Sequence, residues 1–200
     1  MNRAEISHAL FGIALMLMAV ATLRAWRKPT SPARFIWPVL LLVIGFNLFV
    51  PAEDPVDLHH PVGWFETIRD LYPVDPRAWI ISLETGFIVV HKTVALMALL
   101  AGGIELARGI GWIGRSAWSW LLPFASVLAG VLLLLHGIDT DHVAHGSTQL
   151  HHTIFAACFI TGGVLLSLYR SGRLQSTVYR DAWPVLAFVA GLDFAVLFHI

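Results

Sequence analysis

Six long apolar stretches constrain the fold of this chain more than any other feature. A helix that crosses a membrane needs about 20 mostly apolar residues. The stretches that meet or nearly meet this requirement are approximately residues 6–24, 35–51, 79–107, 117–137, 149–169 and 182–200. Only 13% of the 200 residues are charged, against about 25% in a typical soluble domain. The sequence therefore predicts an all-α fold, a single transmembrane domain of about six helices over residues 1–200.

The charges between these stretches predict the orientation of the helices. Nine of the 13 Lys and Arg residues follow the first, third and fifth stretches, namely Arg24, Arg27, Lys28, Arg34, Arg108, Arg115, Arg170, Arg173 and Arg180. Because basic loops stay in the cytoplasm, we expect both termini to face outward. The longest connection, residues 52–78, then forms an outer cap. Tryptophans near the ends of the spans, such as Trp37 and Trp183, are expected in the aromatic belts at the membrane interfaces.

Histidine is over-represented, with ten copies in 200 residues, and five of these fall within residues 136–152. The loop assignments place nine histidines on the outer side, and helix length brings the tenth, His91, there as well. At about 1.5 Å per residue, His91 lies roughly 26 Å from the inner-side Arg108, close to the thickness of the hydrocarbon layer. His8 and His151 precede inner-side arginines by similar spacings. Several histidines are therefore predicted at one height, near the outer membrane boundary.

Clustered histidines point to metal chemistry. Imidazole is the commonest metal ligand in proteins and suits copper, zinc, iron and nickel, and nearby carboxylates can orient the imidazole rings. The sequence therefore predicts a metal site at the outer face. The candidate ligands are His8, His91, His136, His142, His145, His151 and His152, and the secondary candidates are His59, His60, Asp139, Asp141, Asp193 and His199.

Two details of this cluster stay open from the sequence. His151 and His152 point about 100° apart on a helix, so only one of them is expected to face the bundle interior, and either fits. Asp193 lies within the last apolar stretch, where an ionisable side chain usually marks a functional path. It can be a proton relay, the partner of a metal-ligating histidine, or the partner of Lys92.

The arrangement of these residues resembles the bacterial CopD-like copper-resistance proteins of the inner membrane. The matching residues lie within about 45–170 and comprise His91-Lys92, Gly102-Gly103-Ile104-Glu105, Arg108, the leucine run that ends at His136, and His151-His152. Members of that family are multi-pass membrane proteins implicated in handling copper between periplasm and cytoplasm. The resemblance implies an inner-membrane protein that binds copper through His91, His136, His151 and His152, and the loop charges place both termini in the periplasm. Its partners would be the lipid bilayer, a periplasmic metal carrier or other membrane subunits.

Two other functions fit the same pattern. Opposed histidines at one height are also required for bis-histidine ligation of a b-type haem in a helix bundle, which would make the chain an electron-transfer subunit. Alternatively, the chain is an accessory subunit of a larger membrane complex, and the histidines line a docking surface. A formal net charge of zero argues against nucleic acid as a partner. Nucleophile and phosphate-loop motifs are absent from the sequence, so binding, transport or electron transfer is favoured over catalysis.

Overall fold

A computed structural model describes residues 3–49, 83–114, 117–138 and 146–196. These residues form six long α-helices and one short 3-10 helix, and they contain no strand. The elements are α1 (Arg3–Arg27), α2 (Ala33–Phe49), α5 (Leu83–Ile110), η1 (Ala117–Trp120), α6 (Leu121–Ile138), α7 (Gly146–Arg170) and α8 (Thr177–Val196). The predicted all-α fold is confirmed for this part of the chain.

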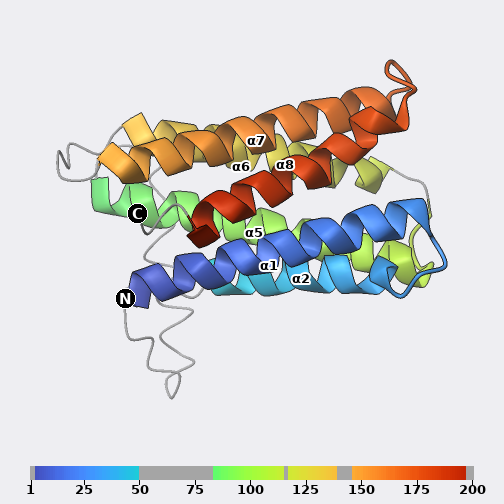
Figure 1. Cartoon of the computed structure of the whole chain (residues 1–200), viewed down its shortest axis with the longest axis horizontal. Coiled ribbons are helices and arrows are strands. Elements are labelled where there is room, and N and C mark those ends of the chain that lie inside the picture. Colours follow the sequence, from blue (N-terminus) through green and yellow to red (C-terminus); the bar gives the residue numbers. More distant parts are fainter. Residues whose placement is uncertain (1–2, 50–82, 115–116, 139–145, 197–200) are drawn as a thin grey trace, which may run out of the picture.

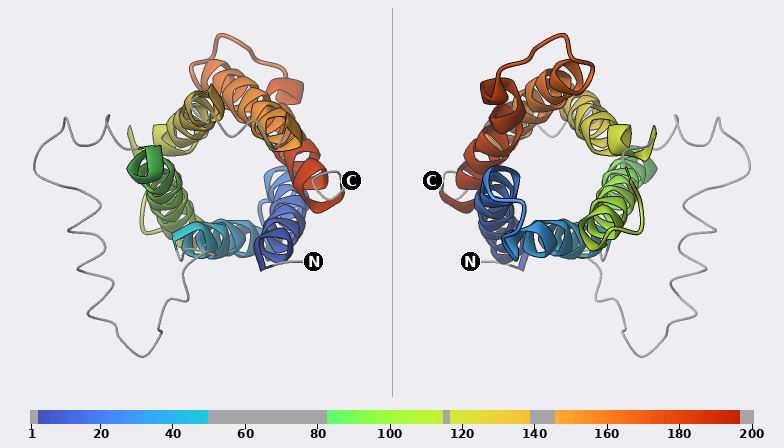
Figure 2. Two further views of the ribbon diagram at one scale, coloured as in Figure 1. Left: turned by 90° about the vertical axis from the view of Figure 1, so that its left-hand side faces the viewer. Right: turned by 90° about the vertical axis from the view of Figure 1, so that its right-hand side faces the viewer.

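The six long helices form a closed ring, in which each helix packs against two neighbours. Around the ring the order is α1, α2, α5, α6, α7 and α8, and α8 closes the ring against α1 (Figure 2). The two chain ends lie at one end of the ring, and the short connections after α1, α5 and α7 lie at the other (Figure 1). We call these the outer end and the inner end, after the orientation that the loop charges predict.

Glycine residues allow the sharp turns at the inner end. Gly111 follows α5 with a φ of 93°, and Gly172 follows α7 with a φ of 75°. This left-handed conformation is unfavourable for a residue with a Cβ, and glycine adopts it readily after a helix. The N–H of Gly111 still donates to the carbonyl oxygens of Ala107 and Arg108, each at 3.1 Å.

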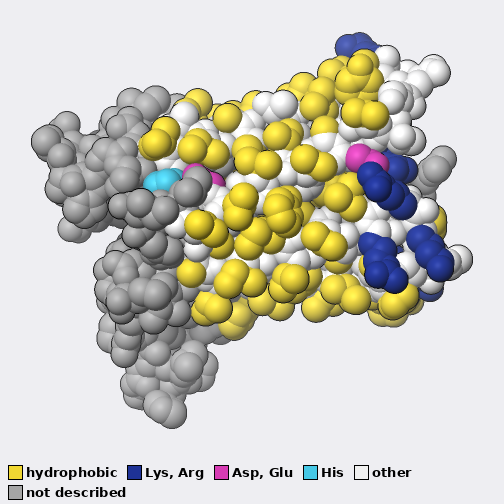
Figure 3. Space-filling model, viewed as in Figure 1, with side chains coloured by type: hydrophobic (Ala, Val, Ile, Leu, Met, Phe, Trp, Pro, Cys, Tyr) yellow, Lys and Arg dark blue, Asp and Glu magenta, His cyan; other side chains and the backbone are white. Residues whose placement is uncertain are grey.

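The outward surface of the ring is apolar along most of its length. Leu10, Leu17 and Val20 of α1, and Val43 and Phe46 of α2, are each more than half exposed. Hydrophobic side chains cover the middle of the visible face, and Lys and Arg gather at the inner end (Figure 3). An apolar surface of this extent is not stable in water, so we conclude that it contacts lipid.

Four helical segments are long and apolar enough to cross a membrane, namely Ala9–Arg27, Lys92–Ile110, Ala117–Leu134 and Leu150–Arg170. The apolar segment of α2, Ala33–Leu48, is shorter than these. The 20 residues of α8 include Arg180, Asp181 and Asp193, and these charges reduce its overall apolar character. The structure thus supports a multi-pass helical membrane protein, with four of the six predicted spans meeting the length and composition of a membrane helix.

Three tryptophans fill the interior of the ring near its inner end. The ring of Trp26 in α1 lies 6.5 Å from that of Trp37 in α2 and 6.2 Å from that of Trp183 in α8, measured between centroids. The indole N–H of Trp183 donates to Oγ of Ser126 in α6 at 2.7 Å. Trp37 and Trp183 are 4% and 2% exposed. The prediction that these two residues lie in interfacial belts is therefore wrong, because helices of the ring enclose them.

Helices α1 and α8 approach each other most closely at a pair of glycines. A Cβ added to Gly12 would lie 2.5 Å from the carbonyl oxygen of Gly191, and one added to Gly191 would lie 2.7 Å from that of Gly12. Small residues at helix crossings allow backbones to pack closely within a membrane. Because this contact closes the ring, the two glycines help to determine the position of α8 and of Asp193 on it.

Candidate functional site

A buried polar contact at the outer end joins α7 to α8. Nδ1 of His151 lies 3.0 Å from each carboxylate oxygen of Asp193, and the two residues are 6% and 3% exposed. When the carboxylate is ionised, it accepts a hydrogen bond from the Nδ1–H group of His151. The neutral imidazole then carries its lone pair on Nε2. The structure thus pairs Asp193 with His151.

This pairing follows from how the two helices run. His151 lies near the start of α7 and Asp193 near the end of α8, so antiparallel packing of these neighbours brings the two side chains to one level. An isolated carboxylate in an apolar interior is strongly unfavourable, and a hydrogen-bonded partner offsets much of that cost. The contact therefore both stabilises Asp193 and fixes the orientation of the imidazole.

His152 is buried beside this pair, with 9% of its surface exposed. Its ring centroid lies 6.4 Å from that of Phe194, the residue after Asp193. The expectation that only one of His151 and His152 faces inward is wrong. Both are enclosed because α7 packs against α6 on one side and α8 on the other, so two adjacent sides of the helix are covered.

Phenylalanine rings fill the interior next to the histidines, on the side of the membrane centre. Phe11 of α1 lies 5.9 Å from Phe155 of α7 and 5.6 Å from Phe194 of α8 between ring centroids. Phe155 stacks on Phe159 at 4.3 Å. Cys158 is 8% exposed and belongs to the same apolar core. The polar site at the outer end therefore borders an apolar, aromatic layer.

The structure describes only part of the predicted histidine cluster. His8 and His136 lie in the outermost turns of α1 and α6, and His91 lies in the third turn of α5. The side chains of these three residues fall outside the described part. Lys92, next to His91, is buried at 6% exposure. Seven further candidates lie outside the described residues, namely His59, His60, Asp139, Asp141, His142, His145 and His199. Among the described side chains, no group of three or more His, Cys, Asp or Glu is placed to hold a metal ion.

A second, partly buried polar cluster lies at the inner end. The sequence pointed to Glu105 only through the family resemblance and to Arg108 also as an inner-side charge, and their cluster with Arg170 was not predicted. Nη1 of Arg108 donates to both carboxylate oxygens of Glu105, at 2.8 and 2.9 Å. Nη2 of Arg170 lies 3.5 Å from Oε1 of the same carboxylate. Arg170 belongs to α7, which is not next to α5 in the ring, so this contact crosses past α6. The available signal was an acid three residues before an arginine in an apolar stretch, a spacing that places both on one helix face.

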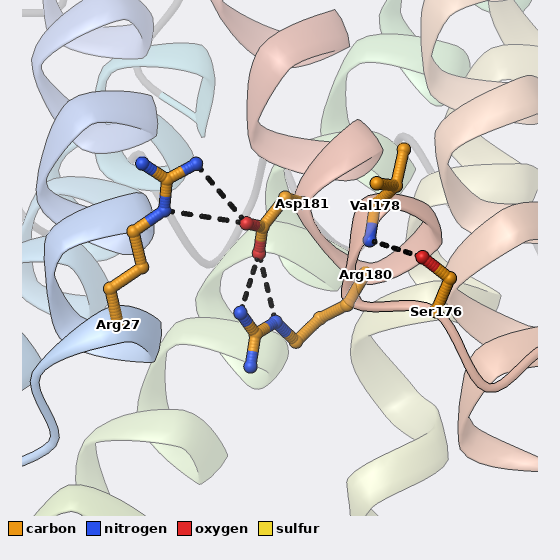
Figure 4. A network of polar contacts seen from close by, with 5 residues as sticks. All are labelled: Arg27, Ser176, Val178, Arg180 and Asp181. Atoms are coloured by element: carbon orange, nitrogen blue, oxygen red, sulfur yellow. Dashed lines mark hydrogen bonds and ion pairs between the residues drawn. The ribbon is translucent and has the colours of Figure 1, made fainter.

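A partly exposed ion-pair network also joins α1 to α8 at the inner end (Figure 4). Asp181 lies 3.3 Å from Nη2 of Arg27 and 2.8 Å from Nη2 of Arg180. The Arg27 side chain is 69% exposed, so water and salt screen its charge. We regard this network as a weak surface clamp.

The two buried clusters differ in the ligands they suit, since imidazole and carboxylate bind metal ions and paired guanidinium groups bind anions. In comparisons with known proteins, no family model, curated protein or solved structure matches the chain. What the structure establishes about its class is an all-helical protein with four helical segments able to cross a membrane.

Proposed function

We propose that this chain is a six-span protein of the bacterial inner membrane that binds copper at its periplasmic face and exchanges it there. The contact of His151 with Asp193 is the single observation that supports this proposal best. Metal-ligating histidines almost always donate their second ring N–H to a carboxylate, a carbonyl or water, which fixes the tautomer and makes the ligand more basic. The 3.0 Å contacts at Nδ1 of His151 match that pattern.

The remaining ligands would come from the histidines that the ring brings to the same end. His152 adjoins His151, and His8, His91 and His136 occupy the outer turns of α1, α5 and α6. Imidazole suits copper, which stands at the top of the affinity order for divalent metals of this series. The resemblance to CopD-like proteins points to the same metal. In this proposal His59, His60, His142 and His145 first capture the ion from the periplasm.

The filled interior of the ring favours exchange at one face over passage through the membrane. From Phe194, ring centroids follow at 5.4 Å to Phe155, 4.3 Å to Phe159 and 6.5 Å to Trp183. An ion that crosses a membrane needs polar groups to replace its water, and these aromatic rings offer none. We therefore propose delivery to a periplasmic carrier or to another subunit on the outer side.

Metal analysis of the purified protein tests this function. Mass spectrometry of the metal content should find copper bound in a fixed ratio to the chain, and equilibrium dialysis should give its affinity. We expect His151→Ala to lower that affinity by about 100-fold or more, because it removes a ligand whose partners alone affect affinity by 10–100-fold in other metal sites.

Ser126→Ala is the matched control. It removes a buried hydrogen bond between α6 and α8, the 2.7 Å contact with Trp183, at a cost of about 1 kcal/mol, but it lies away from the histidines. Copper affinity should stay unchanged in this variant. A haem absorption spectrum in the reduced protein would replace copper with haem b and contradict the proposal. Absence of both metal and haem would contradict it in favour of an accessory subunit.

A further inference from the structure

We propose that the inner end of the ring binds a phosphate group between Arg108 and Arg170. This site is separate from the copper site and does not depend on it. The cluster contains one carboxylate, Glu105, and two guanidinium groups, so it carries one excess positive charge. Its side chains are 8% exposed for Glu105, 24% for Arg108 and 17% for Arg170.

The hydrogen bonds of Arg170 are incomplete in a specific way. Its Nη1 is buried and has no hydrogen-bond partner. Every other buried nitrogen or oxygen among the described side chains has one. Leaving a buried charged donor unsatisfied is unfavourable. A guanidinium group presents its N–H donors in a planar fork that matches the oxygens of phosphate. The unsatisfied Nη1 of Arg170 is therefore the atom we expect a phosphate oxygen to reach.

The carboxylates described at the inner end do not complete this cluster. Both oxygens of Glu105 already accept hydrogen bonds from Arg108, and its contact with Nη2 of Arg170 is longer, at 3.5 Å. Asp181 is engaged by Arg27 and Arg180. Arg108 also lies close enough to Arg170 to repel it electrostatically. The excess charge, together with the buried and unpaired Nη1 of Arg170, therefore favours an anion from outside the chain.

The position of the cluster favours a phosphate group in particular. Arg170 is the last residue of α7, and Arg108 lies in the last turn of α5, so both are at the inner membrane boundary, where phospholipid headgroups lie. A phosphodiester carries one negative charge, which equals the excess of the cluster. Arg108 is the more exposed of the two arginines, so we expect the ligand to enter past it. Free phosphate offers the same oxygens.

Two binding measurements on the whole purified protein test this site and separate the two sources. Native mass spectrometry measures retained phosphatidylglycerol, and equilibrium dialysis in lipid-free detergent measures inorganic phosphate. We expect Arg170→Gln and Arg108→Gln to weaken binding at least about tenfold. The loss should appear in the lipid measurement if the natural ligand is a headgroup, and in the phosphate measurement if it is the free ion. Glu105→Gln raises the excess charge of the cluster, so this variant should bind phosphate at least as tightly as the wild type.

Arg173→Gln is the matched control, because Arg173 is an exposed arginine three residues after Arg170. It should change binding by less than about twofold, since exposed charges are well screened. Loss confined to the lipid arm identifies a headgroup, and loss confined to the phosphate arm identifies the free ion. If Arg170→Gln does not fold, the more exposed Arg108→Gln gives the same comparison. No binding in either arm, or equal losses in Arg170→Gln and Arg173→Gln, would overturn the proposal.

Discussion

The outer and inner ends of the helix ring each hold a buried carboxylate that contacts basic side chains, but the charges of the two clusters differ. At the outer end one carboxylate, Asp193, meets one imidazole, His151. At the inner end one carboxylate, Glu105, meets two guanidinium groups, those of Arg108 and Arg170. An imidazole can lose its proton and become a ligand near neutral pH, whereas arginine stays charged. The outer end is therefore suited to a cation and the inner end to an anion.

Distance separates the two ends, since His151 and Arg170 lie 19 residues apart on α7, which is about 28 Å along a helix. The interior between them consists of buried apolar side chains such as Phe155, Leu166 and Trp183. We therefore expect the charges at each end to act mainly on their own ligand. The comparison predicts that a substitution at one end changes the binding of one ligand only, whereas a substitution that disrupts the shared ring weakens the binding of both.

Gly12→Leu should have the largest effect. It should disrupt the ring and with it the binding sites at both ends. The new side chain would begin 2.5 Å from the carbonyl oxygen of Gly191, and a backbone contact of this kind cannot relax without separating α1 from α8. We expect a loss of more than about 3 kcal/mol in unfolding free energy, and loss of copper and phosphate binding together. Thermal unfolding in detergent measures the first effect.

Gly103→Leu is the control for this substitution, since a Cβ at Gly103 meets nothing within 4 Å. It should unfold at the wild-type temperature. The interpretation of the α1–α8 crossing would be wrong if Gly12→Leu were as stable as this control.

Asp193→Asn should have an intermediate effect, confined to the outer end. Asparagine keeps the shape of the side chain and removes the charge that favours the Nδ1 proton of His151. Copper affinity measured by equilibrium dialysis should fall by about 10–100-fold, and phosphate binding should stay unchanged. Unchanged copper affinity would mean that the contact between His151 and Asp193 serves only to pack α7 against α8.

The smallest expected effect is that of Asp181→Asn, in the exposed clamp at the inner end. The substitution removes the ion pairs with Arg27 and Arg180, and pairs of this exposure contribute about 0.2–1 kcal/mol. The melting temperature should shift by a few degrees at most, with copper and phosphate affinities unchanged. A fall in either affinity would show that the clamp controls a site that we describe as independent of it.

Sequence alone predicted the helices of the described residues, because helix formation in lipid depends on local patterns. Runs of about 20 apolar residues must form helices in lipid, where each backbone group needs a partner within its own helix. The height of His151 followed from its distance along the helix to Arg170. The same reasoning selected Asp193 as a functional residue, since a carboxylate in an apolar span needs an explanation.

The contacts between helices could not be predicted from the sequence, because they depend on which helices are neighbours in the ring. Nothing local pairs Asp193 with His151 rather than with Lys92, and nothing local predicts that both His151 and His152 are enclosed. Arg170 was interpreted only as a cytoplasmic charge, although it reaches the carboxylate of Glu105 on a helix that is not its neighbour. Trp37 and Trp183 were misplaced for the same reason, since residues at a span end can face either lipid or the interior.

X-ray absorption at the copper edge tests the central claim, that the outer end binds copper through His151, most directly. The copper-loaded wild-type protein should give the scattering pattern of imidazole ligands, and His151→Ala loaded at high copper concentration should show one imidazole fewer. Ser126→Ala should reproduce the wild-type spectrum. An identical set of ligands in His151→Ala, or a copper site without imidazole, would contradict the account.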